Sequence, residues 1–190
     1  MVTTVAKLVY SAITSLDGYS ADENGNFDWG RPNEELFAFI NDLERDVGTY
    51  LYGRRMYETM VYWETFEAEM NEPACVHDFV EIWKSADKVV YSTTLETVAS
   101  ARTTIERVID ADIVRQMKQT AAHDITIAGA NLANQAMVAD LIDEVHLFLM
   151  PVTVRGGTPA LPHPFLPEPE LLAVDRFSDG VVHLHYRANR

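Results

Sequence analysis

Two short segments have the residue types needed to hold a phosphate group. Gly53 precedes Arg54 and Arg55 after a short apolar run, and Gly129 occupies a similar place before residues 130–132. A glycine between a buried strand and a helix lets backbone N–H groups and the positive end of the helix dipole approach an anion. The two arginines add positive charge at the first segment. These features favour a site for a phosphate-containing ligand.

Neither segment has the spacing of a familiar nucleotide motif. The six-residue glycine fingerprint of dinucleotide-binding folds and the P-loop pattern are both absent from the sequence. For each glycine alone, an equally good explanation is that it only allows a tight turn between a strand and a helix. Two such junctions together, with arginines at one of them, favour a pyrophosphate.

The histidines and the cysteine do not have the spacing of metal ligands. Cys75 is the single cysteine, which excludes an intramolecular disulfide and a cysteine-based zinc site within one subunit. His183 and His185 alternate near the C-terminus and would lie on one face of a strand. Such a pair is more often solvated or hydrogen-bonded than bound to a metal, so we expect no metal ion.

The chain around these residues alternates between strand-like and helix-like patterns. Strands are expected at residues 6–14, 49–52, 88–91, 125–128 and 144–152, and helices at 33–45, from 53 onward, at 73–86 and at 111–120. A turn signal at residues 178–180 separates two further strands at 171–177 and 181–186. The sequence therefore predicts an α/β fold: a mixed, mostly parallel sheet flanked by helices, with a C-terminal antiparallel hairpin. The long loop over residues 15–32 is expected to act as a lid or binding loop.

Size and composition limit the classes of function. The chain has 190 residues, of which 47% are hydrophobic, and no linker-like stretch divides it, so we expect residues 1–190 to form one domain. A net charge of -14 would repel a nucleic-acid backbone. No apolar run approaches the length of a membrane span, and the first seven residues lack the pattern of a signal peptide. We therefore expect a cytoplasmic protein with no nucleic-acid or membrane partner.

The order of several motifs resembles the dihydrofolate reductase-like superfamily and, more closely, the RibD C-terminal domain family of riboflavin-pathway reductases and their stand-alone relatives. The resemblance covers nearly the whole chain. Its motifs are Ser15-Leu16-Asp17-Gly18, Gly53-Arg54-Arg55-Met56-Tyr57-Glu58, Val89-Val90-Tyr91-Ser92-Thr93-Thr94-Leu95, Gly129-Ala130-Asn131-Leu132, and Leu141-Ile142-Asp143-Glu144-Val145 ahead of Pro151 and Gly156-Gly157. Each motif alone is weak, but the ordered set is specific. It implies the three-layer dihydrofolate reductase-like fold.

The resemblance also implies an NADPH-dependent reductase. Its substrate would be a small heterocycle, either dihydrofolate or another pterin, or a pyrimidine of the 5-amino-6-ribosylaminouracil type. Both glycine segments would hold the phosphates of the dinucleotide, residues 92–94 would lie near its adenosine end, and residues 13, 19 and 20 would border the nicotinamide. The implied cofactor-binding residues are Ile13, Tyr19, Ser20, Gly53, Arg54, Arg55, Met56, Ser92, Thr93, Thr94, Gly129, Ala130, Asn131 and Leu132.

One departure from the family pattern affects the choice of cofactor. Family members often carry a basic residue in the segment that corresponds to residues 92–94, where it can pair with the 2′-phosphate of NADPH. This sequence has no basic residue there. Arg54, Arg55 or hydroxyl donors can compensate, so NADPH remains the expected cofactor and NADH the alternative.

Two carboxylates are candidates for catalysis. Dihydrofolate reductases place an acid early in the helix after the lid loop, and Glu35 occupies the most similar position here. A glutamate at a helix start is more often a surface residue that stabilises the helix dipole. Asp17 precedes a glycine, where an aspartate commonly shapes the turn, and we rank that role above catalysis.

Four further residues are candidates for contact with the substrate. Trp29 and Phe37 could form an apolar wall for a flat ring, although both could equally belong to the core. Arg31 and Arg155 are the basic residues in the loops flanking the expected site, and a phosphorylated substrate would need them.

Other classes of function stay open beside the reductase. The fold could bind a nucleotide without turnover, as a sensor or binding module, because fold does not determine function. The glycines could also be simple turns in a structural or interaction protein. The riboflavin-pathway enzyme commonly carries a zinc deaminase domain, which this chain cannot form with one cysteine. By resemblance, and because two-fold assemblies are common, we expect a homodimer.

Overall fold

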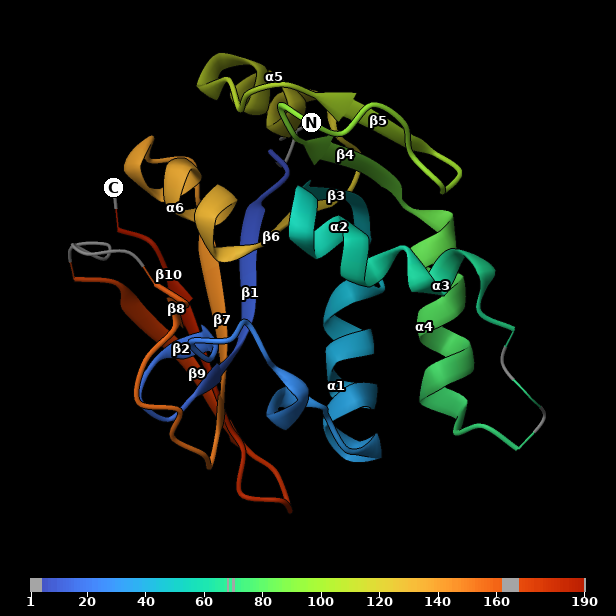
Figure 1. Cartoon of the computed structure of the whole chain (residues 1–190). Coiled ribbons are helices and arrows are strands. Elements are labelled where there is room, and N and C mark those ends of the chain that lie inside the picture. The colour runs from blue at the N-terminus through green and yellow to red at the C-terminus, as the bar shows by residue number, and fades with distance from the viewer. Residues whose placement is uncertain (1–4, 68, 70, 162–167, 190) are drawn as a thin grey trace.

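The computed structural model describes residues 5–67, 69, 71–161 and 168–189 (Figure 1). Residues 1–4, part of the segment used to argue against a signal peptide, lie outside this range. Eight strands form one sheet in the order β5-β4-β3-β6-β1-β7-β10-β9. Their bounds are β1 Leu8–Ser15, β3 Val47–Gly53, β4 Asp87–Tyr91, β5 Thr103–Glu106, β6 Asp124–Ala128, β7 Glu144–Met150, β9 Glu170–Arg176 and β10 Val182–Arg187. Neighbours from β5 to β7 are parallel, whereas β10 pairs antiparallel with both β7 and β9. The predicted mixed sheet with a C-terminal hairpin is confirmed.

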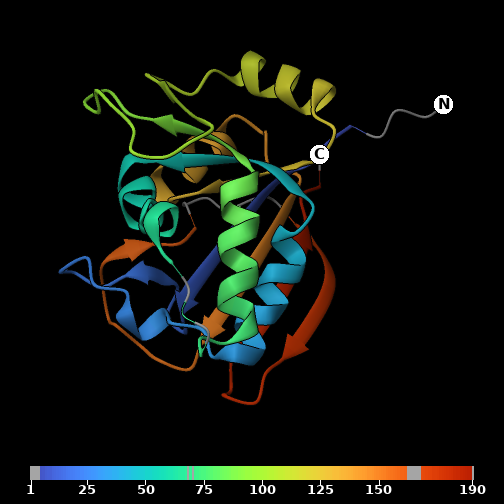
Figure 2. The same ribbon diagram turned by 90° about the vertical axis from the view of Figure 1, so that its right-hand side faces the viewer.

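Helices cover both faces of the sheet. The bounds are α1 Glu34–Glu44, α2 Arg54–Met60, α3 Tyr62–Thr65, α4 Ala74–Ser85, α5 Ala111–Thr120 and α6 Ala130–Val138, with a short 3-10 turn η1 at Asp28–Gly30. Figure 2 shows α1 and α4 side by side on one face of the sheet. Side chains of α5 and α6 join the core cluster on the opposite face. The result is the expected three-layer arrangement.

The helix starts follow local capping chemistry. The side chain of Asn33 accepts a hydrogen bond from the backbone N–H of Leu36 at 2.9 Å, as the predicted N-cap of α1 should. Asp110 caps α5 in the same way, accepting from the N–H groups of Asp112 and Ile113. Gly129 precedes α6 with φ of 102°, a conformation that an L side chain rarely adopts.

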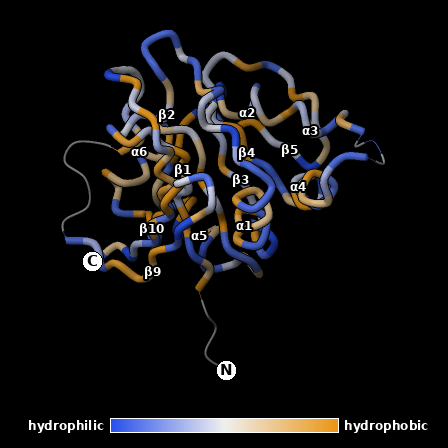
Figure 3. The backbone as a smooth tube through the Cα atoms, turned by 90° about the horizontal axis from the view of Figure 1, so that it is seen from below, coloured by the Kyte–Doolittle hydropathy of each residue, from blue (hydrophilic) through white to orange (hydrophobic). Residues whose placement is uncertain are grey.

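The two faces of the sheet have different cores. The α5 and α6 face is mainly aliphatic, and Leu51, Ile125 and Ile127 there are fully buried. The opposite face is aromatic, with Tyr52 and Trp83 among its buried residues. Figure 3 shows hydrophobic stretches concentrated along the sheet and hydrophilic stretches mainly in the outer loops. Among the described residues, no helix is long and apolar enough to cross a membrane.

Some elements lack a clear signal in the sequence. β5 is a four-residue edge strand in which residues are alternately half-buried and exposed, so its pattern is too short and too polar to predict. The long loop after β1 is also tied down by a small sheet, in which β2 (Tyr19–Ala21) pairs antiparallel with β8 (Thr158–Pro159). That pairing joins residues more than a hundred positions apart, which local patterns cannot show.

Candidate functional site

The predicted cofactor segments follow strands that are neighbours in the sheet. The order β4-β3-β6-β1 is continuous, and all four strands are parallel. The register pairs Gly53 with Tyr91 and Tyr52 with Ala128. The chain therefore leaves the sheet on the same side, at the carboxyl ends of the parallel strands, at residues 53–56, 92–94 and 129–132. In open α/β sheets, ligands bind at this edge.

The two glycine segments touch each other. A Cβ atom placed on Gly129 would lie 3.6 Å from the backbone nitrogen of Gly53 and 3.5 Å from the Cβ of Met56. A Cβ atom on Gly53 would lie 3.7 Å from the Cβ of Leu132. The absence of side chains at both positions therefore leaves backbone from β3 and β6 closely apposed at the starts of α2 and α6. We call this contact the glycine junction.

Arg54 joins the glycine junction to the segment after β4. Its Nη1 donates to the hydroxyl of Thr94 at 2.7 Å, and its Nε donates to Glu58, also at 2.7 Å. The buried hydroxyl of Ser92 accepts hydrogen bonds from the backbone N–H groups of Thr94 and Leu95. The structure thus brings Arg54 to the segment of Ser92 and Thr94, although Arg54 and Thr94 are 40 positions apart in the sequence.

Arg107 is a basic residue at this segment that the sequence pattern does not reveal. Its Nη1 donates to the backbone carbonyls of Ser92 at 3.0 Å and Leu95 at 2.8 Å. The residue is exposed, so the rest of its guanidinium can meet a ligand. Residues 92–94 lack a basic side chain of their own, and Arg107 supplies one from the end of β5. The unpredicted edge strand explains why spacing along the chain did not reveal it.

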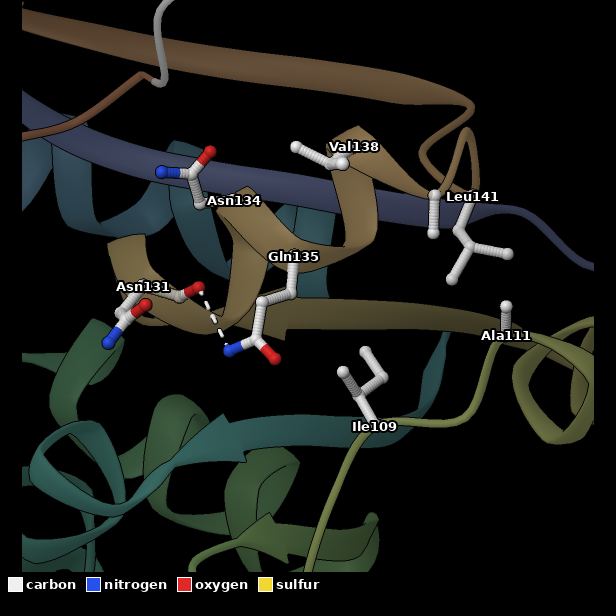
Figure 4. Close-up of a pocket in the computed structure, with 8 residues that line it drawn as sticks. Ile109, Ala111, Asn131, Asn134, Gln135, Val138 and Leu141 are labelled. Carbon is white, nitrogen blue, oxygen red and sulfur yellow. Dashed lines mark hydrogen bonds between the residues drawn. The ribbon is translucent and has the colours of Figure 1, made fainter.

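A groove of about 520 Å³ runs beside α6 (Figure 4). Figure 4 shows Gln135 and Ile109 extending into it from opposite sides, and the Gln135 amide donates to the Asn131 carbonyl at 3.4 Å. Ile109 comes two residues after Arg107, and Asn131 lies in the first turn of α6. The groove thus extends the glycine junction with a surface that is part apolar and part amide.

The lid loop lies at the same edge, on the β1 side. The N–H of Tyr19 donates to the Ser15 hydroxyl at 3.0 Å, and the Ser20 hydroxyl donates to the Thr158 carbonyl at 3.2 Å. A Cβ on Gly30 would lie 3.1 Å from Cγ2 of Ile13, so the loop packs on that residue.

Arg55 faces the lid loop rather than residues 92–94. It lines a second opening, of about 720 Å³, whose other residues are Asp22, Glu23, Asn24, Gly25, Gly157 and Thr158. The two consecutive arginines therefore serve different sides of the glycine junction, with Arg54 toward Thr94 and Arg55 toward the lid.

The two candidate carboxylates are engaged in holding loops. Asp17 accepts the backbone N–H groups of Val154 and Arg155, and its pKa is lowered, first by a hydrogen bond from Ser15 and then by those N–H groups. Glu35 accepts from the hydroxyl and the N–H of Ser178, which lower its pKa as well. Both carboxylates are thereby stabilised in the ionised form, which suits a positioning role better than that of a proton donor.

The four candidate substrate residues are dispersed. Phe37 packs against the aromatic rings of Trp63 and Phe79. This packing agrees with the interpretation of Phe37 as a core residue. Trp29 is half-buried and packs against the hydrophobic core cluster between α1 and the sheet. Arg31 is largely exposed and pairs with Asp28 at 2.7 Å. Arg155 is exposed and faces solvent from the loop that Asp17 holds. Contact of any of these residues with a substrate stays a prediction.

Comparison with known families fits this geometry. The family model described as the RibD C-terminal domain matches residues 6–182, which span both glycine segments, the β4 end and β7. The chain belongs to the RibD C-terminal domain family. Membership supports a reductase-like function of the kind found in the riboflavin pathway. No curated protein sequence matches the chain.

Solved structures share the fold of this RibD C-terminal domain at low identity. A protein from Shewanella sp. PV-4, provisionally assigned to riboflavin biosynthesis, has a TM-score of 0.74 and 21% identity, with 97% of this chain and 99% of that chain covered. A pyrimidine reductase-like protein from Corynebacterium diphtheriae has a TM-score of 0.62 and 13% identity, with coverage of 98% and 93%.

A third similar structure is longer than this chain. It is the diaminohydroxyphosphoribosylaminopyrimidine deaminase/5-amino-6-(5-phosphoribosylamino)uracil reductase of Thermotoga maritima, with a TM-score of 0.68 and 14% identity. The match covers 97% of this chain but 57% of that one. At these identities the three comparisons establish the fold.

Proposed function

We propose that this protein is an NADPH-dependent reductase that delivers a hydride to a heterocyclic substrate. The preferred candidate substrate is an aminopyrimidine of the riboflavin pathway, and the alternative is a dihydropterin. The observation that carries the proposal is the glycine junction. Two helix starts from adjacent strands meet there, and the residue just before each helix is a glycine. Backbone N–H groups at such a junction suit a pyrophosphate.

The residues present fit the phosphates and the adenosine part of the dinucleotide. Gly129 has a φ of +102°, which an L side chain rarely adopts, and its missing Cβ leaves room beside the backbone nitrogen of Gly53 for a phosphate. Arg54 and Arg107 flank residues 92–94, where the 2′-phosphate would pair with guanidinium groups. The groove between Ile109 and Gln135 has apolar and amide surface for the adenine ring. When bound, the nicotinamide supplies the hydride.

Local charge makes anion binding compatible with an acidic protein. Arg54, Arg55 and Arg107 all come from the same edge of the sheet, although the net charge is -14. A few oriented cations and helix N-termini can create a positive pocket on a negative molecule. Distant carboxylates matter less, because salt screens charges farther apart than about 8–10 Å.

The chain's own groups would mainly position the reactants. Asp17 fixes the loop that carries Arg155, and Glu35 fixes the turn at Ser178. Since both carboxylates are held ionised, we assign the accompanying proton to water that reaches the substrate. Positioning and exclusion of bulk water then account for most of the catalysis.

The first experiment is a titration of the full chain with NADPH and, in parallel, NADH, followed by quenching of tryptophan fluorescence. We expect saturable binding with NADPH preferred. Arg54→Ala should weaken NADPH binding by about tenfold, since a charge-assisted hydrogen bond contributes about 1.5–3 kcal/mol. Arg176→Ala, which removes an exposed charge from β9, is the matched control and should bind normally. No binding of either nucleotide would overturn the proposal and favour a structural role for the glycines.

Turnover distinguishes a reductase from a nucleotide sensor. NADPH oxidation would be followed by absorbance with 5-amino-6-(5-phosphoribosylamino)uracil, its dephosphorylated form and dihydrofolate as separate acceptors. Oxidation with the pyrimidines is the expected result. Tight NADPH binding with no oxidation against any acceptor would instead favour the sensor. We also propose a homodimer, which light scattering during size-exclusion chromatography would measure.

A further inference from the structure

A second cluster of reactive side chains lies away from the glycine junction. Glu144 and His146 alternate on β7, so both point to the face covered by α1, and the sheet register places His185 of β10 opposite His146. These residues are in the first half of β7, whereas the candidate nucleotide site is at the carboxyl ends of the strands. The cluster is therefore independent of the proposed reductase site.

The three side chains are close enough to share one ion. One oxygen of Glu144 and one ring nitrogen each of His146 and His185 lie within 4.8 Å of one another. Glu144 and His146 are buried, with exposed fractions of 7% and 6%. Nε2 of His185 is 3.0 Å from Glu144, and the two imidazole rings stack at 4.1 Å between centroids. Because the two rings are nearly parallel, with 17° between their planes, the partly exposed His185 ring must rotate out of the stack to turn a nitrogen toward a shared centre.

Hydrogen bonds behind His146 orient its ring. Nδ1 of His146 is 2.8 Å from Nε2 of His183, and Nδ1 of His183 is 2.9 Å from the carboxylate of Asp175. An ionised carboxylate only accepts, so His183 donates to Asp175 and accepts from His146. This assignment leaves the lone pair of His146 on Nε2. Metal-binding histidines are commonly oriented by a hydrogen bond of this kind.

We propose that Glu144, His146 and His185 bind one first-row divalent metal ion, with Zn²⁺ as the best match. Two neutral imidazoles and one carboxylate are a familiar ligand set for zinc, and three protein ligands leave a fourth position for water or a small anion. Spacing along the chain could not reveal the site, because His146 comes from a different strand than His185. The expectation of no metal ion rested on the spacing of the histidines along the chain, which does not show that His146 and His185 are neighbours in the sheet.

One cation competes with the ion for Glu144. Nζ of Lys7 is 2.9 Å from Glu144, and the Lys7 side chain is half exposed. Lys7 contacts Oε1 of Glu144 and His185 contacts Oε2, so the positive charge of Lys7 opposes a Zn²⁺ ion on the His185 side, although the flexible Lys7 stem can also move into solvent. Arg187, opposite Glu144 on β10, pairs with Glu170 and so does not compete directly. Lys7 therefore weakens the site without blocking it.

The test uses the full chain after dialysis against a chelator. Titration with Zn²⁺ alone, against a chromophoric chelator, should give one ion per chain. His185→Gln should weaken that binding at least tenfold, whereas His123→Gln, at an exposed histidine outside the cluster, should leave it unchanged. Lys7→Met should tighten binding, because it removes the competing ammonium group from an exposed position.

The outcomes separate a metal site from a purely structural cluster. Co²⁺ in place of zinc should give the visible absorption of a four-coordinate centre in the parent chain and lose it in His185→Gln. Circular dichroism checks that each variant is folded. If the parent binds no more Zn²⁺ than His185→Gln, or if Lys7→Met leaves the affinity unchanged, the proposal is wrong and the histidines only hydrogen-bond one another.

Discussion

The glycine junction and the sheet face under α1 use polar groups in opposite ways. At the junction, Gly53 and Gly129 present backbone, and the arginines around them are exposed. Under α1, Glu44, His146 and His183 are buried among packed side chains. Backbone groups exposed at a sheet edge can bind a ligand without a large effect on folding. Buried titratable groups affect stability directly, because their charged forms lose hydration.

The contrast predicts different consequences of mutation. Changes at the junction should alter ligand affinity more than the free energy of unfolding. Changes under α1 should alter the free energy of unfolding and its dependence on pH. The four predictions below challenge this contrast, from the largest expected effect to the smallest.

Gly129→Val should reduce NADPH affinity on the order of 100-fold, because losing one or two phosphate contacts costs about 1.5–3 kcal/mol each. Its Cβ would press toward Gly53 at a φ of +102°. Isothermal titration calorimetry measures the affinity. Gly180→Val, in the hairpin turn between β9 and β10, is the control for strain, since Gly180 also has a positive φ, of +88°. If both variants lost NADPH affinity equally, the loss would come from backbone strain and not from the glycine junction.

Glu44→Gln should stabilise the protein by about 3 kcal/mol at pH 8 and have little effect at pH 4.5. Burial raises the pKa of Glu44 to about 7, because the carboxylate loses its hydration. A raised folded-state pKa contributes stability below the unfolded value, near 4.5, and that contribution is lost as pH rises through 7. Urea unfolding at both pH values measures the difference.

Glu34→Gln is the control for this pH effect, since it makes the same substitution at an exposed position of α1. It should leave the pH dependence of unfolding as it is in the parent. Destabilisation of Glu44→Gln at pH 8 would show that the buried carboxylate is stabilising in its ionised form.

Arg107→Met should weaken NADPH binding by about tenfold and leave NADH binding nearly unchanged, because the guanidinium would pair with the 2′-phosphate alone. Competition binding with both nucleotides measures the ratio. Arg107 also holds the carbonyls of Ser92 and Leu95. An equal loss for both nucleotides would therefore assign Arg107 a structural role and leave the 2′-phosphate without this partner.

Arg45→Ala should have the smallest effect on the free energy of unfolding, close to the limit of detection, although Arg45 contacts both carboxylate oxygens of Asp78 at 2.9 and 2.8 Å. Its side chain is half exposed, so water and salt screen the pair. Thermal unfolding at low and high salt measures the effect, which should shrink as salt is added. A large effect independent of salt would contradict the distinction between Arg45 and its buried neighbour Glu44.

Much of the fold could be predicted from local patterns. The N-cap at Asn33, the hairpin turn at residues 178–180 and the apolar strand β7 all depend on neighbours in the sequence. β5 could not be predicted, since four half-polar residues at an edge carry little pattern. The sequence favoured structural roles for Asp17 and Glu35 but could not show their partners, because Arg155 and Ser178 come from distant loops.

The sequence by itself determined the alternation of strands and helices, the glycines at two strand ends and the family resemblance, because each depends on short-range order along the chain. Only the tertiary structure decided that Gly53 touches Gly129, that Arg107 reaches residues 92–94 and that His146 lies opposite His185. These contacts depend on the order and register of strands in the sheet. Strand order is set by packing of the whole chain, so no local pattern contains it.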